Sequence, residues 1–133
     1  MANALAASIK KQFLDGDRDL LSETVKVSLI DHNDVTPNPA THDYYNDVQS
    51  GEVAVATLAS KTTTGGSFDA ADPTFSAVSG DQAEGVVVWV DTAGASSTDP
   101  LVAIYDTFSS GMPVTPNGGD ITLTVAASGF FSL

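Results

Sequence analysis

Apolar residues recur with two different periods along the chain, and the change of period separates a helical start from a longer β-rich part. Within residues 3–15, Leu5, Ile9 and Phe13 are spaced four apart, which places them on one face of a helix. Gly16 follows and suits the left-handed turn at a helix end. The pattern therefore predicts an N-terminal helix over about residues 3–15.

From about residue 23 onward the pattern is typical of strands. Alternating apolar positions or continuous apolar runs predict strands at residues 23–30, 53–60, 86–90, 101–105 and 121–125, with further strand positions at Phe68, Phe75 and Val78. The run 86–90 (VVVWV) is apolar throughout, which is typical of a central strand covered on both faces. We therefore expect the strands to enclose one core with Trp89 inside it.

The first long segment between predicted strands is rich in turn-forming residues. Residues 31–41 are predicted to form a loop, because aspartate, asparagine and proline predominate there. Thr41 is expected to cap a short helical turn over residues 43–48. That turn would leave Tyr44 and Tyr45 lying on the core.

These elements together define an expected fold class. Several short strands separated by glycine-, serine- and proline-rich turns predict one domain over residues 1–133, of the α+β class and mainly antiparallel β. A sandwich or a partial barrel fits this pattern, with the N-terminal α-helix covering an open face or edge. Phe130, Phe131 and Leu133 indicate a C-terminus anchored by packing.

Charge narrows the choice of partner. The 133 residues include 17 acidic and 5 basic side chains, for a net charge of −12, and no lysine or arginine follows Lys61. Nucleic acids and anionic membrane surfaces both attract basic proteins, so we expect neither as a partner. A strongly charged surface keeps crowded copies soluble, and a salt-rich source is a second interpretation of the same composition.

Other features of the composition argue against several kinds of site and against targeting or membrane-spanning segments. The chain has no cysteine, so disulfides, zinc–thiolate sites and thiol nucleophiles are excluded. The positive charges at Lys10 and Lys11 follow a short apolar stretch, the reverse of the order in a signal peptide. No run approaches the roughly 20 apolar residues of a membrane span. We therefore expect assembly in the cytoplasm.

One acidic stretch has part of a calcium-loop pattern. Asp15, Asp17 and Asp19 match its first, third and fifth positions, but Leu20 stands where glycine is needed and Lys26 where a bidentate glutamate is needed. A solvated turn after the helix is the better interpretation. The sequence predicts no metal site here.

A second candidate site lies in the following loop. His32 with Asp31 and Asp34, and His42 at a distance, have no spacing typical of metal ligands, and surface positions explain them better. The serines lack a nucleophile-elbow motif. We therefore predict no catalytic, cofactor-binding or metal-binding residue and a protein that is not an enzyme. A small hydrolase or carbohydrate-binding enzyme is the least favoured alternative.

The loop at residues 111–119 (GMPVTPNGG) is the candidate contact region. Two prolines stiffen it, which lowers the cost of ordering it against a partner, and Met112 and Val114 are apolar in an otherwise polar segment. A plain connection between strands is the other interpretation. We predict partner contacts by Met112, Pro113 and Val114, with Lys10 and Lys11 meeting acidic groups of a neighbouring subunit.

Four stretches resemble a family of small structural proteins of tailed-bacteriophage virions. They are residues 1–5 (MANAL), 40–48 (ATHDYYNDV), 72–84 (DPTFSAVSGDQAE) and 113–120 (PVTPNGGD). With the strands between them, the likeness extends over most of the chain. The third and fourth stretches are the most specific, because neither is an ordinary turn or strand sequence.

The resemblance implies a virion structural protein without a catalytic mechanism or cofactor. Its partners would be the major capsid protein or other virion proteins, and it would form homo-oligomers on the particle. The favoured role is a capsid decoration or cement protein that binds and stabilises the major capsid shell. A neck, tail or fibre-base component that forms a ring or adaptor is the alternative.

Overall fold

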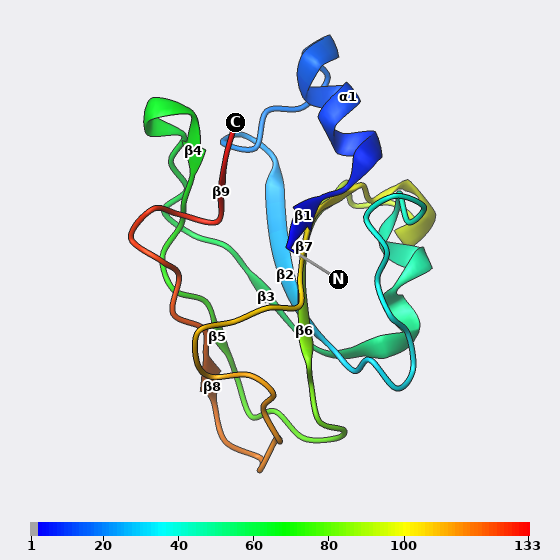
Figure 1. Ribbon diagram of the computed structural model, residues 1–133, viewed down its shortest axis with the longest axis vertical. Coiled ribbons are helices and arrows are strands. Elements are labelled where there is room, and N and C mark those ends of the chain that lie inside the picture. Colours follow the sequence, from blue (N-terminus) through cyan, green and yellow to red (C-terminus); the bar gives the residue numbers. More distant parts are fainter. Residues whose placement is uncertain (1–2) are drawn as a thin grey trace.

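A five-stranded antiparallel sheet forms the centre of the fold in the computed structural model, which describes residues 3–133 (Figure 1). The strand order is β1-β7-β6-β2-β3. The strands are β1 (Ala4–Leu5), β7 (Leu101–Tyr105), β6 (Gly85–Asp91), β2 (Thr24–Ile30) and β3 (Glu52–Thr57). Strand β6 lies in the middle and is buried from Gly85 to Val90, which confirms the expected central strand.

Two short ribbons extend this sheet. Strands β5 (Thr74–Phe75) and β8 (Ile121–Thr122) pair in one ribbon, and β4 (Ser67–Phe68) and β9 (Phe131–Ser132) pair in the other. Strand β5 lies against β3, and the Tyr105 hydroxyl of β7 donates to the Phe130 carbonyl at 2.7 Å. The sheet therefore curls without closing into a barrel, and the α+β class with antiparallel β dominant is confirmed.

The helix is shorter than the sequence predicted. Helix α1 spans Ala7–Asp15 and ends at Gly16, which has a φ of 76° and donates its N–H to the Phe13 carbonyl at 3.2 Å. The predicted start at residue 3 is wrong, because Ala4 and Leu5 pair with β7. Strand pairing gives hydrogen-bond partners to backbone groups of β7 that would otherwise face solvent at the sheet edge.

Two strand predictions in the second half of the chain need correction. In the predicted strand 121–125, only Ile121 and Thr122 are paired in a strand. Their partner β5 begins after Pro73, which has no N–H to donate and accepts from the Leu123 N–H at 3.0 Å. Residue Val78 is buried but lies outside any strand.

The remaining differences are at strand ends and at the C-terminus. The strand expected at 53–60 is β3, which ends at Thr57. Anchoring of the C-terminus is confirmed for Phe130 and Phe131, which pack against the core, but Leu133 is 75% exposed. The Leu133 N–H still donates to the Gly66 carbonyl at 3.0 Å, so the backbone of the last residue is held while its side chain faces solvent.

Each face of the sheet is covered by a different part of the chain. Ser28 and Trp89 lie on one face, because the Trp89 indole N–H donates to the Ser28 hydroxyl at 2.9 Å. Tyr45 covers this side, which we call the tyrosine face. Tyr105 lies on the opposite side, which we call the phenylalanine face. It is covered by Phe13, Phe68, Phe130 and Phe131, whose rings contact one another.

The segment over the tyrosine face contains two turns of 3₁₀-helix, η1 (Tyr45–Asp47) and η2 (Gln49–Gly51). Tyr45 is 1% exposed, as predicted, whereas Tyr44 is 40% exposed, so the expectation that both rings lie on the core is wrong. Tyr44 precedes the turn and has extended backbone (φ −129°, ψ 160°). Consecutive side chains of extended backbone point to opposite sides, so only one of the two rings faces the sheet. Asp47 accepts the Asp43 and Tyr44 N–H groups and takes the capping role predicted for Thr41.

Tyr45 and Trp89 form the buried contact between this segment and the sheet. Their rings are stacked with centroids 3.9 Å apart and an interplanar angle of 12°. The Ser28 hydroxyl lies 2.9 Å from the Tyr45 hydroxyl, which in turn donates to the Glu52 carboxylate. Every polar atom of this contact thus has a partner, which removes the cost of burying it.

We expect Trp89→Ala to lower the free energy of unfolding by about 3–5 kcal/mol, because it removes the stack and leaves a cavity. Urea denaturation followed by far-UV circular dichroism measures the change. The native fluorescence of this single tryptophan should be blue-shifted, since the side chain is 6% exposed. Leu14→Ala, at a helix position 89% exposed, is the control and should change stability by less than about 0.5 kcal/mol. A loss below about 1 kcal/mol for Trp89→Ala would contradict the packing.

Alkaline pH should destabilise the fold through two tyrosines. Burial, and then hydrogen bonding to Glu52, raises the pKa of Tyr45 well above the ordinary value of 10.0. Burial likewise raises the pKa of Tyr105. Below pH 10 both phenols are protonated in the folded and unfolded states, and their contribution to stability is fully present. Above pH 10 only the unfolded chain releases these protons, so the free energy of unfolding falls as pH rises.

The expected slope is about 1.4 kcal/mol per pH unit for each of these two tyrosines. Urea denaturation at several pH values between 9 and 12 measures it. Tyr45→Phe and Tyr105→Phe should each reduce the slope, and the double variant should reduce it most. Equal slopes in the parent and the double variant would show that other groups cause the alkaline loss.

Candidate functional site

The residues predicted for partner contact lie at two opposite ends of the molecule. Helix α1, which carries Lys10 and Lys11, is at the top of Figure 1, whereas the loop at 111–119 is at the bottom beside β8. Lys10 and Lys11 are both exposed, and the Lys11 ammonium group pairs with the Asp15 carboxylate. A single partner could meet both groups only by spanning the length of the molecule.

The contact loop itself is partly built into the fold. Met112 and Val114 are half-buried and pack against the core, whereas Pro113 is exposed. Val114 and Ala83 exchange two backbone hydrogen bonds, of 3.0 and 2.9 Å. The loop is therefore held against a second loop. The side chains of Met112 and Val114 are partly packed in the core and partly exposed to solvent.

Two loops distant in sequence are joined along their length at this end. The Gly118 N–H donates to the Val78 carbonyl at 2.7 Å, and the Val78 N–H donates to the Gly119 carbonyl at 3.0 Å. The Ala77 N–H donates to the Asp120 carboxylate at 2.9 Å. We call residues 77–83 and 112–120 the paired-loop end.

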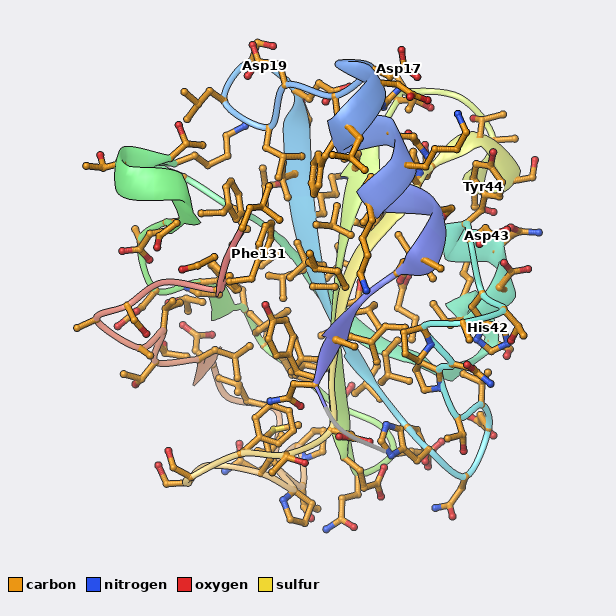
Figure 2. The ribbon with its side chains drawn as sticks, turned by 45° about the horizontal axis from the view of Figure 1, so that its top comes forward. Asp17, Asp19, His42, Asp43, Tyr44 and Phe131 are labelled. Carbon is orange, nitrogen blue, oxygen red and sulfur yellow. The ribbon has the colours of Figure 1, made fainter. Side chains whose placement is uncertain are left out.

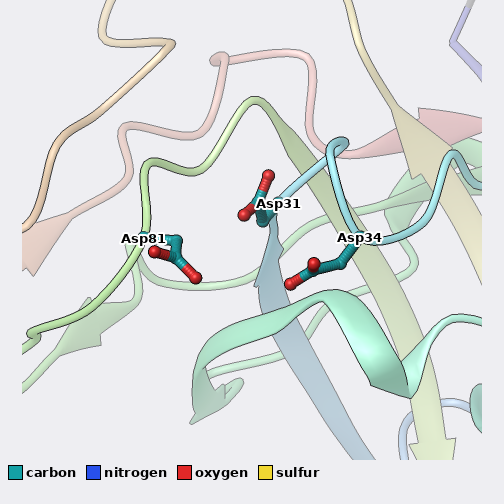
Figure 3. A group of neighbouring side chains, drawn as sticks. All are labelled: Asp31, Asp34 and Asp81. Atoms are coloured by element: carbon teal, nitrogen blue, oxygen red, sulfur yellow. The ribbon is translucent and has the colours of Figure 1, made fainter.

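Three carboxylates meet beside the paired-loop end (Figure 3). Oxygen atoms of Asp31, Asp34 and Asp81 all lie within 4.8 Å of one another. Asp31 is buried and accepts the Asn33 N–H at 2.8 Å, whereas Asp34 and Asp81 are exposed. Carboxylate oxygens are the usual ligands of calcium, and these are the residues of the described chain that could share a cation. Asp81 could not be found from sequence spacing, because it comes from a different loop.

The two histidines do not join these carboxylates. The His42 Nδ1 atom accepts the Asn38 N–H at 3.0 Å. The His32 ring packs against Gly85, and its buried Nε2 atom has no hydrogen-bond partner among residues 3–133. Of the residues considered together from the sequence, Asp31 and Asp34 are close to each other in the structure. Their third neighbour is Asp81, not a histidine.

The acidic stretch after helix α1 is a set of separate contacts. Asp15 pairs with Lys11, and Asp17 is exposed. A hydrogen bond from the Ser22 hydroxyl, followed by one from the Leu21 N–H, lowers the pKa of Asp19 below its ordinary value. Each carboxylate is held by its own local partner or by solvent, so the three side chains point to different surroundings.

Two open depressions lie at the helix end of the molecule. The larger has a volume of about 540 Å³ and is lined by Gln12, Asp17, Arg18, Tyr44, Ser97, Thr98 and Pro100. The smaller, of about 190 Å³, lies between Phe13, Leu20, Phe68 and Phe131, with Arg18 on its wall. Neither depression includes a histidine or the 111–119 loop.

Comparison with known proteins adds no relative. No protein-family model matches the chain, and no curated protein matches it. Among residues 3–133, no helix has the length and apolar character required to cross a bilayer.

We expect Asp81→Asn to stabilise the protein at low salt, because it removes one of three mutually repelling carboxylates. The gain should be below about 1 kcal/mol and should shrink as salt screens the repulsion. Thermal unfolding in 10 mM and 500 mM NaCl measures it, with exposed Asp17→Asn as the matched control. If the parent is instead the more stable protein in calcium chloride, and Asp81→Asn loses that gain, the three carboxylates bind a cation.

Proposed function

We propose that this protein is a non-enzymatic structural component of a tailed-bacteriophage virion. More specifically, we propose a capsid decoration or cement protein that binds the assembled major capsid shell. The observation that supports this most directly is the position of the two most specific resembling stretches. Residues 72–84 and 113–120 are distant in sequence, yet backbone bonds between Ala83 and Val114 and between Val78 and Gly118 join them.

The charge of the paired-loop end supports contact with a partner that supplies cations. Asp81 and Asp120 are exposed there, and Asp34 is adjacent, while no lysine or arginine occurs after Lys61. Like-charged copies repel one another, so lysines or arginines of a capsid protein would be favoured neighbours. Pro113, with the exposed parts of Met112 and Val114, would form the apolar centre of that contact.

The proposed role has a simple thermodynamic basis. A protein that binds the assembled shell, but not its separate subunits, stabilises the shell by a free energy that grows with the logarithm of its concentration relative to the dissociation constant. The decoration protein needs no active site for this. It needs only a stable fold and a surface complementary to groups that come together when the shell assembles.

Copy number separates the favoured role from the alternative. A decoration protein would be present at hundreds of copies per particle, whereas a neck, tail or fibre-base ring would contain roughly 3 to 12 by the usual ring symmetries. Quantitative band intensities from purified particles, normalised to the major capsid protein, give this number. A value of 12 or fewer would replace the decoration role with the ring or adaptor role.

Charge reversal tests the contact surface. We expect Asp81→Lys to fold normally, because the side chain is exposed, and to lose at least tenfold in affinity for particles. Asp17→Lys makes the same charge change at the opposite end and should bind as the parent does. Binding is measured by adding each protein to undecorated particles and pelleting them. Equal loss in both variants would indicate a general charge effect, and no loss in either would contradict the proposed contact.

A further inference from the structure

The larger depression brings together residues from three separate elements. Gln12 comes from helix α1, Tyr44 from the residue before η1, and Ser97 from η4 (Ser96–Thr98). Figure 2 shows Asp17 at the end of helix α1 and Tyr44 on the same side of the molecule. The depression lies far from the paired-loop end, so the contact proposed above leaves it open.

Several of the polar groups that line it are unused by the fold, whereas the Thr98 hydroxyl donates to the Ala95 carbonyl at 2.7 Å. Within residues 3–133, the Gln12 amide, the Asp17 carboxylate and the Ser97 hydroxyl make no hydrogen bond or ion pair. Arg18 pairs with Glu23 through one terminal nitrogen at 2.8 Å, but its buried Nε atom has no partner. The wall thus presents donors and acceptors side by side: amide and hydroxyl groups that do both, a carboxylate that accepts and a guanidinium that donates.

Two flat apolar surfaces accompany these groups. The Tyr44 ring is 40% exposed although its neighbour Tyr45 is buried, and Pro100 lies beside it in the wall. Backbone bonds fix the position of both residues. Tyr44 and Pro100 form a β-bridge, and the Tyr45 N–H donates to the Asp99 carbonyl at 2.8 Å. A tyrosine side chain on such a fixed backbone has only two rotatable χ angles, so packing a ligand on the ring costs little conformational entropy.

Charge decides which class of ligand fits. Glu23 already neutralises Arg18, and Asp17 adds an unpaired negative charge, so phosphates and other anions are disfavoured. A sugar ring has an apolar C–H face for an aromatic ring and hydroxyls that both donate and accept. We propose that this depression binds one neutral hexose unit, as found at the end of a surface glycan.

The site is open and shallow, so we expect weak binding of single sugars. A dissociation constant on the order of 1 mM is expected for a ligand of about a dozen non-hydrogen atoms. The proposal concerns a different surface from the particle contact, and it holds or fails independently of the role in the virion.

Two-dimensional ¹H–¹⁵N NMR titration of the full chain tests the proposal. The probes are the methyl glycosides of glucose, galactose, mannose and N-acetylglucosamine, each added to 50 mM. We expect saturable shifts for at least one of them at the backbone amides of Gln12, Tyr44 and Ser97. Tyr44→Ala should weaken binding at least tenfold, whereas Tyr44→Phe should retain it within about threefold because it keeps the ring. Leu14→Ala, on the same helix but outside the depression, should bind as the parent does.

Three results would overturn the proposal. The first is the absence of localised shifts with all four glycosides. The second is unchanged binding by Tyr44→Ala, whose spectrum also reports whether that variant is folded. The third is a set of shifts at the same amides produced equally by sodium phosphate, which would identify an anion site at Arg18 instead.

Discussion

The stack of Tyr45 on Trp89 joins the segment between β2 and β3 to the central sheet, and the hydrogen bonds of its polar atoms make this contact specific. An indole N–H buried in a sheet needs an acceptor, and the Ser28 hydroxyl provides one at 2.9 Å. Ser28 and Glu52 then satisfy the Tyr45 hydroxyl. In a chain without cysteine, this satisfied network holds the segment from β2 to β3 over the sheet. Sliding that segment along the sheet would break the stack and leave the network's hydrogen-bonding groups without partners.

The stack also determines what the neighbouring residue does. Because Tyr45 faces the sheet, Tyr44 faces outward, where its ring forms a wall of the larger depression. The β-bridge between Tyr44 and Pro100 fixes the backbone of Tyr44 beside the segment that follows η4. Packing of Tyr45 on the tyrosine face therefore determines the shape of the larger depression. The spacing of apolar residues in the sequence does not indicate that depression.

Charge is distributed unevenly over this framework. Lys11, Arg18 and Lys26 each pair with a carboxylate, and Lys61 donates to the Glu23 carbonyl, so most of the basic side chains are used within the chain. The paired-loop end has acidic groups and no lysine or arginine. The two proposals follow this division: a partner that supplies positive charge for the paired-loop end, and an uncharged ligand for the depression near Tyr44.

Patterns over a few residues of the sequence predicted those elements that are formed by interactions between residues close together in the chain. The apolar run of β6 and the glycine after helix α1 indicate their structures because burial and backbone preference act within a few residues. Other features depend on contacts between distant segments. Leu5 joins β7 rather than the helix, Asp81 meets Asp31 across two loops, and Gln12 meets Tyr44 in one depression. The spacing of apolar residues along the chain does not predict these long-range contacts, because they depend on how the sheet curls and which loops it brings together.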